Sequence, residues 1–118
     1  MSHSIAIVDD EPDTVQLFTD ILSTNGYNVA GFTNPLLALE HIQENQEEYD
    51  LILLDYKMTP IDGCNFAKKI AEVNTSITII IITAANDIGN NPLQLQVYFK
   101  PLIMSKLIEI VKKNIPSV

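Results

Sequence analysis

The sequence predicts an α/β fold in which a five-stranded parallel sheet is covered by helices on both faces. Two observations carry this prediction. Short apolar runs recur along the chain, and each run except one is followed by a stretch whose apolar residues have helical spacing. Strands of a parallel sheet are buried on both faces, so they read as nearly continuous apolar runs. The length of 118 residues is typical of one domain, and residues 1–118 are expected to form it.

The first strand and helix are predicted within the first 26 residues. Residues 4–8 form an apolar run that suits a strand. Pro12 then stands in the first turn of a helix, where proline is tolerated because no amide donor is needed. The apolar residues of this helix follow at helical spacing: Val15, Phe18 and Leu22. Asn25-Gly26 is typical of a helix end, so the unit closes there.

Two further units follow in the same order. Residues 27–32 read as a strand, and Asn34-Pro35 is typical of a helix start. The residues expected on the buried face of this helix are Leu36, Leu39 and Ile42. Residues 51–54 are wholly apolar, which predicts a buried strand that ends at Asp55. A helix is expected from about residue 64 to residue 73.

The last part of the chain predicts two strands but only one helix. Residues 77–83 are rich in β-branched side chains and favour a fourth strand, and residues 95–99 favour a fifth. Between them, Gly89 and Pro92 disfavour a helix, since proline alone costs about 3 kcal/mol in a helix interior. Residues 86–94 are therefore expected to form an irregular loop or one short turn. The final helix is expected to end near Ile115-Pro116, with an apolar face made by Ile103, Leu107 and Val111.

Charge and cysteine content exclude several classes of function. Fifteen acidic against seven basic residues give a formal net charge of -8, which would repel a nucleic-acid backbone. The single cysteine, Cys64, cannot form an internal disulfide, which favours a reducing compartment, and it is expected to pack near the core. No secretion signal or membrane-spanning run is found, so we expect a cytoplasmic protein that binds neither membrane nor nucleic acid. His3 and His41 are expected at ordinary surface positions.

Polar residues stand at the ends of four of the predicted strands. Asp9-Asp10-Glu11 follows the first strand, Asp55 the third and Lys100-Pro101 the fifth, while Thr83 ends the fourth. Parallel α/β sheets bind ligands at the carboxyl ends of their strands, so these side chains are expected to converge. Two carboxylates about 4 Å apart repel by roughly 4 kcal/mol at an effective dielectric of about 20. Mg²⁺, which prefers oxygen ligands, would relieve that repulsion.

This ordered set of residues closely resembles the receiver domains of two-component response regulators. The resemblance runs from residues 5–11 to residues 99–102 and includes Asp62-Gly63 after Asp55, so it covers essentially the whole chain. It implies a doubly wound, flavodoxin-like (CheY-like) fold with the strand order 2-1-3-4-5. The connection between the fourth and fifth strands is shorter than is usual in this family, so the fourth helix is expected to be degenerate.

The resemblance also implies a role for each polar residue. Asp55 would be the phosphoacceptor and would take its phosphoryl group from the phosphohistidine of a histidine kinase. Mg²⁺ would be held by Asp9, Asp10, Asp55 and the main-chain carbonyl of Lys57. Thr83 and Lys100 would contact phosphoryl oxygens, and the peptide bond before Pro101 would be cis. Such a domain assists its own phosphorylation and dephosphorylation without being a turnover enzyme, and its partners would be a sensor histidine kinase or phosphotransfer protein and a downstream protein.

Three features depart from the family pattern. Pro60 lies one place later than is usual, and Lys57 places a cation beside the site. Val97 occupies the place of the usual aromatic switch residue. Strand alternation places Val97 and Phe99 on one face and Tyr98 on the other, so Tyr98 cannot replace it. The usual coupling between threonine and aromatic residue is therefore expected to be weak.

Other functions fit parts of the sequence. A degenerate receiver would bind partners without being phosphorylated, which the altered switch favours and the complete set of Asp55, Thr83 and Lys100 opposes. A flavin- or nucleotide-binding protein would need a glycine- or serine-rich phosphate loop after the first strand, where Asp9-Asp10-Glu11 would repel phosphate. Taken alone, these three acids could also simply favour the N-terminus of the next helix through its dipole.

Overall fold

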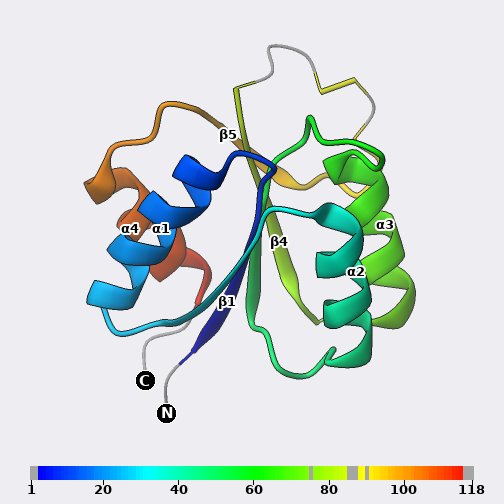
Figure 1. Ribbon diagram of the computed structural model, residues 1–118, viewed down its shortest axis with the longest axis horizontal. Helices are drawn as coiled ribbons and strands as arrows, with labels where there is room; N and C mark the ends of the chain where they lie inside the picture. Colours follow the sequence, from blue (N-terminus) through cyan, green and yellow to red (C-terminus); the bar gives the residue numbers. More distant parts are fainter. Residues whose placement is uncertain (1–2, 75, 85–87, 90, 116–118) are drawn as a thin grey trace.

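Five parallel strands form one sheet in the order β2-β1-β3-β4-β5, as predicted (Figure 1). The structure, a computed structural model, describes residues 3–74, 76–84, 88–89 and 91–115. The strands are β1 Ser4–Val8, β2 Asn28–Phe32, β3 Leu51–Leu54, β4 Thr78–Thr83 and β5 Gln96–Phe99. The apolar runs in the sequence therefore locate each strand to within one residue at either end.

The described residues form helices on both faces of this sheet. They are α1 Pro12–Thr24, α2 Pro35–Glu44, α3 Gly63–Val73 and α4 Met104–Asn114. In Figure 1, α1 and α4 lie on one side of the sheet and α2 and α3 on the other. Two separate apolar clusters fill the layers, one beneath α1 and α4 and one beneath α2 and α3. The doubly wound architecture is therefore confirmed.

Neighbouring residues of β1 and of β3 supply the two clusters in turn, because successive side chains point to opposite faces of a sheet. Ile7 and Leu53 belong to the cluster beneath α1 and α4, whereas Val8 and Leu54 belong to the cluster beneath α2 and α3. All four side chains are buried. Burial on both faces explains why the inner strands β1, β3 and β4 are almost continuously apolar, since each such side chain contributes about 1.5–3 kcal/mol to folding.

Two predicted helix faces need correction. The buried residues of α2 are Pro35, Ala38, Leu39 and Ile42. Leu36 lies one residue, or about 100°, away from this row and is 49% exposed. Ile103 is 69% exposed because it is the N-cap of α4 and precedes its first turn. Leu107 and Val111 are buried as predicted, together with Ile110. The predicted face of α1 is confirmed at all three positions.

The connection between β4 and β5 contains no helix in its described part, which is residues 84, 88–89 and 91–95. Gly89 has a φ of 60°, and a turn lies at Pro92 and Leu93. The Asn91 side-chain oxygen accepts a hydrogen bond from the amide of Leu95 at 3.1 Å, which holds the return to β5. The predicted irregular loop is confirmed at 88–89 and 91–94, whereas residues 86, 87 and 90 lie outside the described residues.

Cys64 and the two histidines are packed against the body of the domain. Cys64 is buried, as expected, and this burial raises the pKa of its thiol. The histidines are half-buried rather than ordinary surface residues. His41 Nε2 lies 2.8 Å from the Tyr49 hydroxyl, and His3 Nδ1 lies 3.4 Å from the Asp50 carboxylate. One nitrogen of each partly buried ring therefore has a polar partner.

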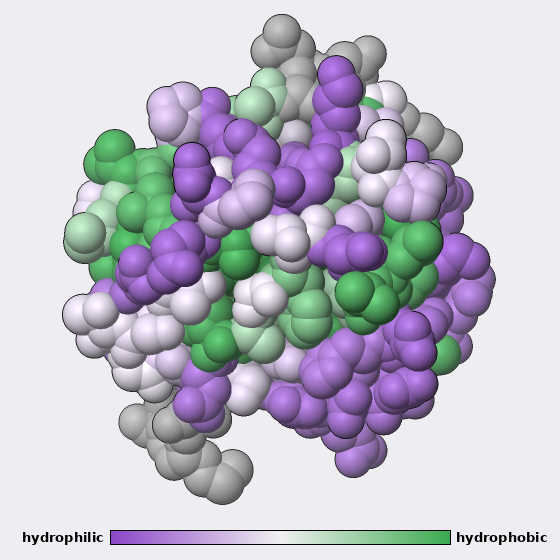
Figure 2. Space-filling view, in the orientation of Figure 1, coloured by the Kyte–Doolittle hydropathy of each residue, from purple (hydrophilic) through white to green (hydrophobic). Residues whose placement is uncertain are grey.

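The visible surface separates charged and apolar residues. Figure 2 shows hydrophilic residues gathered over the lower end of α2 and the turn that follows, where Glu40, Glu44, Glu47 and Glu48 are exposed. Apolar residues gather at the upper left, over the starts of α1 and α4, where Leu17, Ile103 and Met104 are exposed. Within the described residues, no helix combines the length and the hydropathy that crossing a membrane requires.

Candidate functional site

The sheet register brings the ends of the strands to one level. The last residues of β1 and β3 pair with each other. Asp9 and Asp55, which follow them, therefore lie side by side. On the other side of β3, the amide of Lys100 donates to the carbonyl of Thr83 at 2.8 Å. Asp9, Asp55 and Thr83 are buried. The four residues lie together at the carboxyl edge of the sheet, as the sequence predicts.

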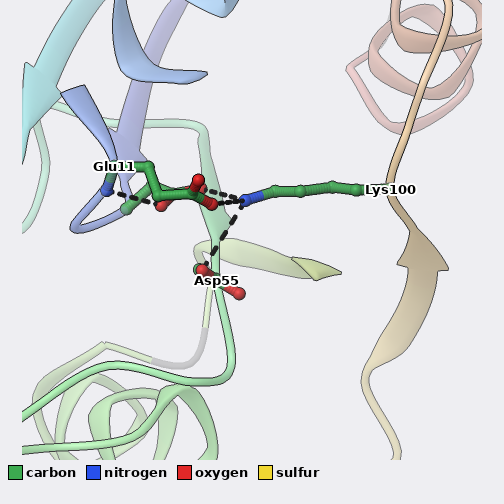
Figure 3. A network of polar contacts seen from close by, with 4 residues as sticks. Glu11, Asp55 and Lys100 are labelled. Atoms are coloured by element: carbon green, nitrogen blue, oxygen red, sulfur yellow. Dashed lines mark hydrogen bonds and ion pairs between the residues drawn. The ribbon is translucent and has the colours of Figure 1, made fainter. Parts of the chain in front are cut away.

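Lys100 reaches from the end of β5 into the carboxylate cluster, as Figure 3 shows. Its Nζ lies 2.6 Å from Asp9 Oδ2 and 3.2 Å from Glu11 Oε1. The distance from Nζ to Asp55 Oδ2 is 3.6 Å. Asp9 is held from a second direction, because its Oδ1 accepts a hydrogen bond from the amide of Glu11 at 2.9 Å. One ammonium therefore contacts three carboxylates.

The charges at this site are out of balance. Burial raises the pKa of the Asp9 carboxyl, and the negative charge of Asp55 adds to this effect, while hydrogen bonds from Lys100 and from the Glu11 amide only partly oppose it. Burial alone would lower the pKa of Lys100, but its contacts with Asp9, Asp55 and Glu11 outweigh burial and hold this pKa above its usual value. The site therefore has more negative charge than one ammonium neutralises.

The carboxylates fit a hard cation. Ligand oxygens of Asp9, Glu11 and Asp55 all lie within 4.8 Å of one another. Asp55 Oδ1 is buried and has no hydrogen-bond partner among the described residues. Such an oxygen costs about 1–3 kcal/mol unless something satisfies it. Mg²⁺ prefers oxygen ligands of this kind and would both satisfy Oδ1 and neutralise the excess charge.

The grouping contains Glu11 in place of Asp10, and it does not include the main-chain carbonyl of Lys57, which the sequence also predicts as a metal ligand. Asp10 and Lys57 are exposed and lie at the rim of the site. The hollow above Asp55 is lined by Asp10, Glu11, Asp55, Lys57, Thr83 and Ala84. Glu11, to which the sequence pattern assigns no role, contacts Lys100 directly. Its only signal in the sequence is its place after the acidic pair, at the end of the same strand.

The loop after Asp55 is packed tightly against the start of α3. The amide of Gly63 donates to the carbonyl of Tyr56 at 2.7 Å. A Cβ atom at Gly63 would lie 2.5 Å from the carbonyl oxygen of Asp55, so only glycine fits there. Asp62 is the N-cap of α3 and accepts a hydrogen bond from the amide of Asn65 at 2.8 Å. Asp62-Gly63 therefore positions the backbone of the predicted phosphoacceptor.

Two proline peptide bonds near the site are cis. The bond between Lys100 and Pro101 is cis, as the resemblance implies. The bond between Thr59 and Pro60 is also cis, which the sequence does not predict. Pro60 is the proline that lies one place later than usual, and Met58 in the same loop is buried.

The aromatic residues of β5 follow the predicted alternation. Tyr98 packs against the cluster beneath α1 and α4, and its hydroxyl donates to Gln96 Oε1 at 3.0 Å. Val97 pairs with Ile81 and is half-buried. Phe99 pairs with Thr83 and is 55% exposed. No aromatic side chain of β5 is therefore packed in the interior on the face that Val97 occupies.

Comparisons with known proteins agree with this geometry. A family model described as response regulator receiver domain matches residues 5–112. Sporulation initiation phosphotransferase F of Bacillus subtilis (strain 168) is 30% identical over 121 residues, which cover 98% of this chain and 96% of the relative. A receiver domain protein of Clostridium thermocellum has the same fold, with a TM-score of 0.86 at 22% identity and coverage of 95% of this chain and 93% of the other. A chain of the CheX-CheY-BeF3-Mg complex of Borrelia burgdorferi gives a TM-score of 0.81 at 23% identity, with coverage of 94% and 87%.

Proposed function

Because the chain belongs to the family of response regulator receiver domains of two-component systems, we propose that Asp55 accepts a phosphoryl group in a Mg²⁺-dependent reaction. The environment of Asp55 carries this proposal. Its Oδ1 is buried yet has no hydrogen-bond partner among the described residues, and the residue lines the hollow at the sheet edge. One oxygen of this carboxylate would bind the metal, which leaves the other as the nucleophile. Intact-mass measurement after incubation with a small phosphodonor and Mg²⁺ tests the assignment.

In the proposed reaction, a carboxylate oxygen of Asp55 attacks the phosphorus of a phosphohistidine. The new P–O bond forms as the P–N bond breaks and the imidazole leaves. Lys100 would transfer its ammonium contact from Asp9 to a phosphoryl oxygen, and the hydroxyl of Thr83 would donate to another. Mg²⁺ bound at the site would neutralise the charge that builds up on the transferred group. The domain would thus assist its own phosphorylation without acting as a turnover enzyme.

The phosphodonor would be a sensor histidine kinase or a phosphotransfer protein, in keeping with the name of the Bacillus relative. A groove beside the hollow supports docking at this edge, and it is lined by Glu11, Thr14, Leu17, Phe18, Ala84, Lys100, Pro101 and Leu102. Leu17 is exposed in the groove, and Ile103 is exposed just beyond it. Exposed apolar residues beside a reactive group are typical of a protein interaction site. A downstream protein would recognise the phosphorylated form.

A degenerate receiver that binds partners without phosphorylation is the second candidate. It is favoured by Val97 at the usual aromatic position and by a connection between β4 and β5 that is not helical in its described part. The convergence of Asp55, Thr83 and Lys100 at one edge of the sheet opposes it, since these are the residues that the proposed phosphorylation requires. Nucleotide or flavin binding is opposed by the carboxylates of Asp9 and Glu11 at the end of β1, which would repel a phosphate.

Replacing Asp10 by alanine is expected to weaken Mg²⁺ binding about tenfold and to slow phosphorylation in parallel. The metal-free protein should keep or gain thermal stability, because the change relieves carboxylate repulsion. Asp10 is exposed, and the N-cap of α1, Glu11, makes no side-chain capping bond, so no structural contact is lost. Asp13→Ala, which removes an acid from the first turn of α1, is the control. Marked destabilisation by Asp10→Ala alone would instead assign this acid to the helix terminus.

Phosphorylation is expected to slow amide hydrogen exchange between β4 and β5. Thr83 would draw Ala84 and Ala85 towards the phosphoryl group, and the loop over residues 86–94 would be rearranged as a consequence. In the structure Ala84 is exposed and lines the hollow, while Ala85 lies outside the described residues. Amide exchange and backbone chemical shifts, recorded before and after phosphorylation, measure the change. A stable helix of two turns across 86–94, or identical exchange in both states, would argue against this switch.

A further inference from the structure

The ammonium of Lys100 stands where the carboxylates converge. Its Nζ lies 2.6 Å from Asp9 Oδ2 and 3.6 Å from Asp55 Oδ2, so it contacts two residues that also fit the metal. The Lys100 side chain is 13% exposed, and the two acids are more deeply buried still. In the metal-free domain, Lys100 is therefore the counter-charge of the site.

Mg²⁺ and Lys100 would compete for the same oxygens. Both carboxylate oxygens of Asp9 are already engaged, because Oδ2 accepts from Lys100 and Oδ1 accepts from the amide of Glu11. A divalent cation and an ammonium also repel each other when they share a ligand, and partial burial strengthens this repulsion. We therefore expect the ammonium of Lys100 to move away from Asp9 when the metal binds, while it stays near enough to meet the phosphoryl group.

Glu11 offers Lys100 a place to which it can withdraw. Its Oε1 lies 3.2 Å from Nζ, and its side chain is 62% exposed, whereas Asp9 and Asp55 are buried. Figure 3 shows Glu11 facing Lys100 across the site, with Asp55 on a different side of the ammonium. Glu11 also lines both the hollow above Asp55 and the adjoining groove. It can hold the ammonium at the boundary of these two spaces.

We propose that Glu11 is a positioning residue for Lys100: its carboxylate holds the ammonium beside the site while Mg²⁺ takes the oxygens of Asp9 and Asp55. This inference rests on the proposed Mg²⁺-dependent function. Without Glu11, Lys100 has only Asp9 and Asp55 as acidic partners among the contacts described for it, so it competes more strongly with the metal. The effect of Glu11 on Mg²⁺ affinity is therefore exerted through Lys100.

A double-mutant cycle on the unphosphorylated full chain tests this mechanism by calorimetric titration with Mg²⁺. Glu11→Gln is expected to weaken Mg²⁺ binding about fivefold in the native background, but less than about twofold when Lys100 is replaced by methionine. Asp13→Asn, which removes an exposed charge from the first turn of α1, should change the affinity less than about twofold in both backgrounds. An equal loss for Glu11→Gln in both backgrounds would show that Glu11 acts on the metal directly and would overturn the proposal.

Glu11→Asp separates contact from charge, because it keeps the carboxylate but shortens its reach by one methylene group. It should behave like Glu11→Gln if the contact with Lys100 matters, and like the native chain if charge alone matters, which would overturn the proposal.

A second readout is the ammonium signal of Lys100 in nitrogen-15 spectra of the Mg²⁺-saturated protein. Slow exchange of its protons with water is expected in the native chain and rapid exchange in Glu11→Gln; equal exchange in both would contradict the proposal.

These outcomes are distinct from a failure of the proposed function. Mass gain at Asp55 is measured separately and does not depend on the cycle. The native chain could bind Mg²⁺ while Glu11→Gln weakens binding equally in the native and Lys100→Met backgrounds. That result would overturn the role of Glu11 and leave the proposed phosphorylation in place. No Mg²⁺ binding by the native chain would overturn the proposed function and the role of Glu11 together.

Discussion

Asp55→Asn is expected to abolish the gain of one phosphoryl group that the native chain shows after incubation with acetyl phosphate or a phosphoramidate and Mg²⁺. A carboxamide is a much poorer nucleophile than a carboxylate, and it also removes one negative charge from the metal site. Asp55 stands at the end of the central strand, where its Oδ1 is buried without a partner among the described residues. Intact-mass spectrometry measures this difference. The variant should show no added phosphoryl group at any time at which the native chain still carries one.

Asp50→Asn is the matched control, because Asp50 immediately precedes β3 whereas Asp55 immediately follows it. Asp50 makes its contacts at the amino ends of the strands, away from the site, with the amide of Ser4 and with His3. This variant should be phosphorylated as the native chain is, and chelation of Mg²⁺ should prevent the reaction in both. An equal mass gain in Asp55→Asn would refute the assignment of the phosphoacceptor. No gain in the native chain would favour a receiver that acts without phosphorylation.

The fold was predictable because strand burial leaves a strong pattern in the sequence. The inner strands of this sheet are covered on both faces, so residues such as Leu51–Leu54 have no solvent-facing position and are all apolar. The buried face of a helix is harder to predict from the sequence, because an error of one residue in the assigned position rotates that face by about 100°. Leu36 and Ile103 are apolar residues at helix starts, and neither joins the buried row of its helix.

The site was predictable as far as strand order determines it. Parallel pairing places Asp9, Asp55 and Thr83 at one edge once the strands are known, and no side-chain detail is needed. The contact between Lys100 and Glu11 joins residues 89 positions apart and depends on how far two long side chains reach. Sequence spacing does not encode such a reach. The cis bond at Thr59-Pro60 likewise was not predicted from the sequence.

Gly63→Ala is expected to destabilise the domain by about 2–3 kcal/mol, because its Cβ would meet backbone atoms that cannot move aside independently. The added atom would lie 2.5 Å from the Asp55 carbonyl oxygen and 2.9 Å from Tyr56 Cα. To relieve this contact, α3 and the loop after Asp55 have to separate, which also strains the hydrogen bond from the Gly63 amide to the Tyr56 carbonyl. Thermal unfolding followed by circular dichroism should show a midpoint lowered by about 10 °C.

The same change is expected to slow phosphorylation at least about tenfold at a temperature where the variant is fully folded, because small displacements of a reacting group are costly. Gly31→Ala separates this effect from general instability. Its Cβ would lie 2.5 Å from Val15 Cγ1 and 3.3 Å from Thr19 Oγ1, which are side-chain atoms of α1 and no part of the site. It should therefore lower the unfolding midpoint and leave the phosphorylation rate within about twofold of the native value. If the phosphorylation rate falls in both glycine variants in proportion to the loss of stability, Gly63 supports only the fold. If the rate falls in Gly63→Ala alone, the tight turn beside Asp55 is part of what positions the phosphoacceptor.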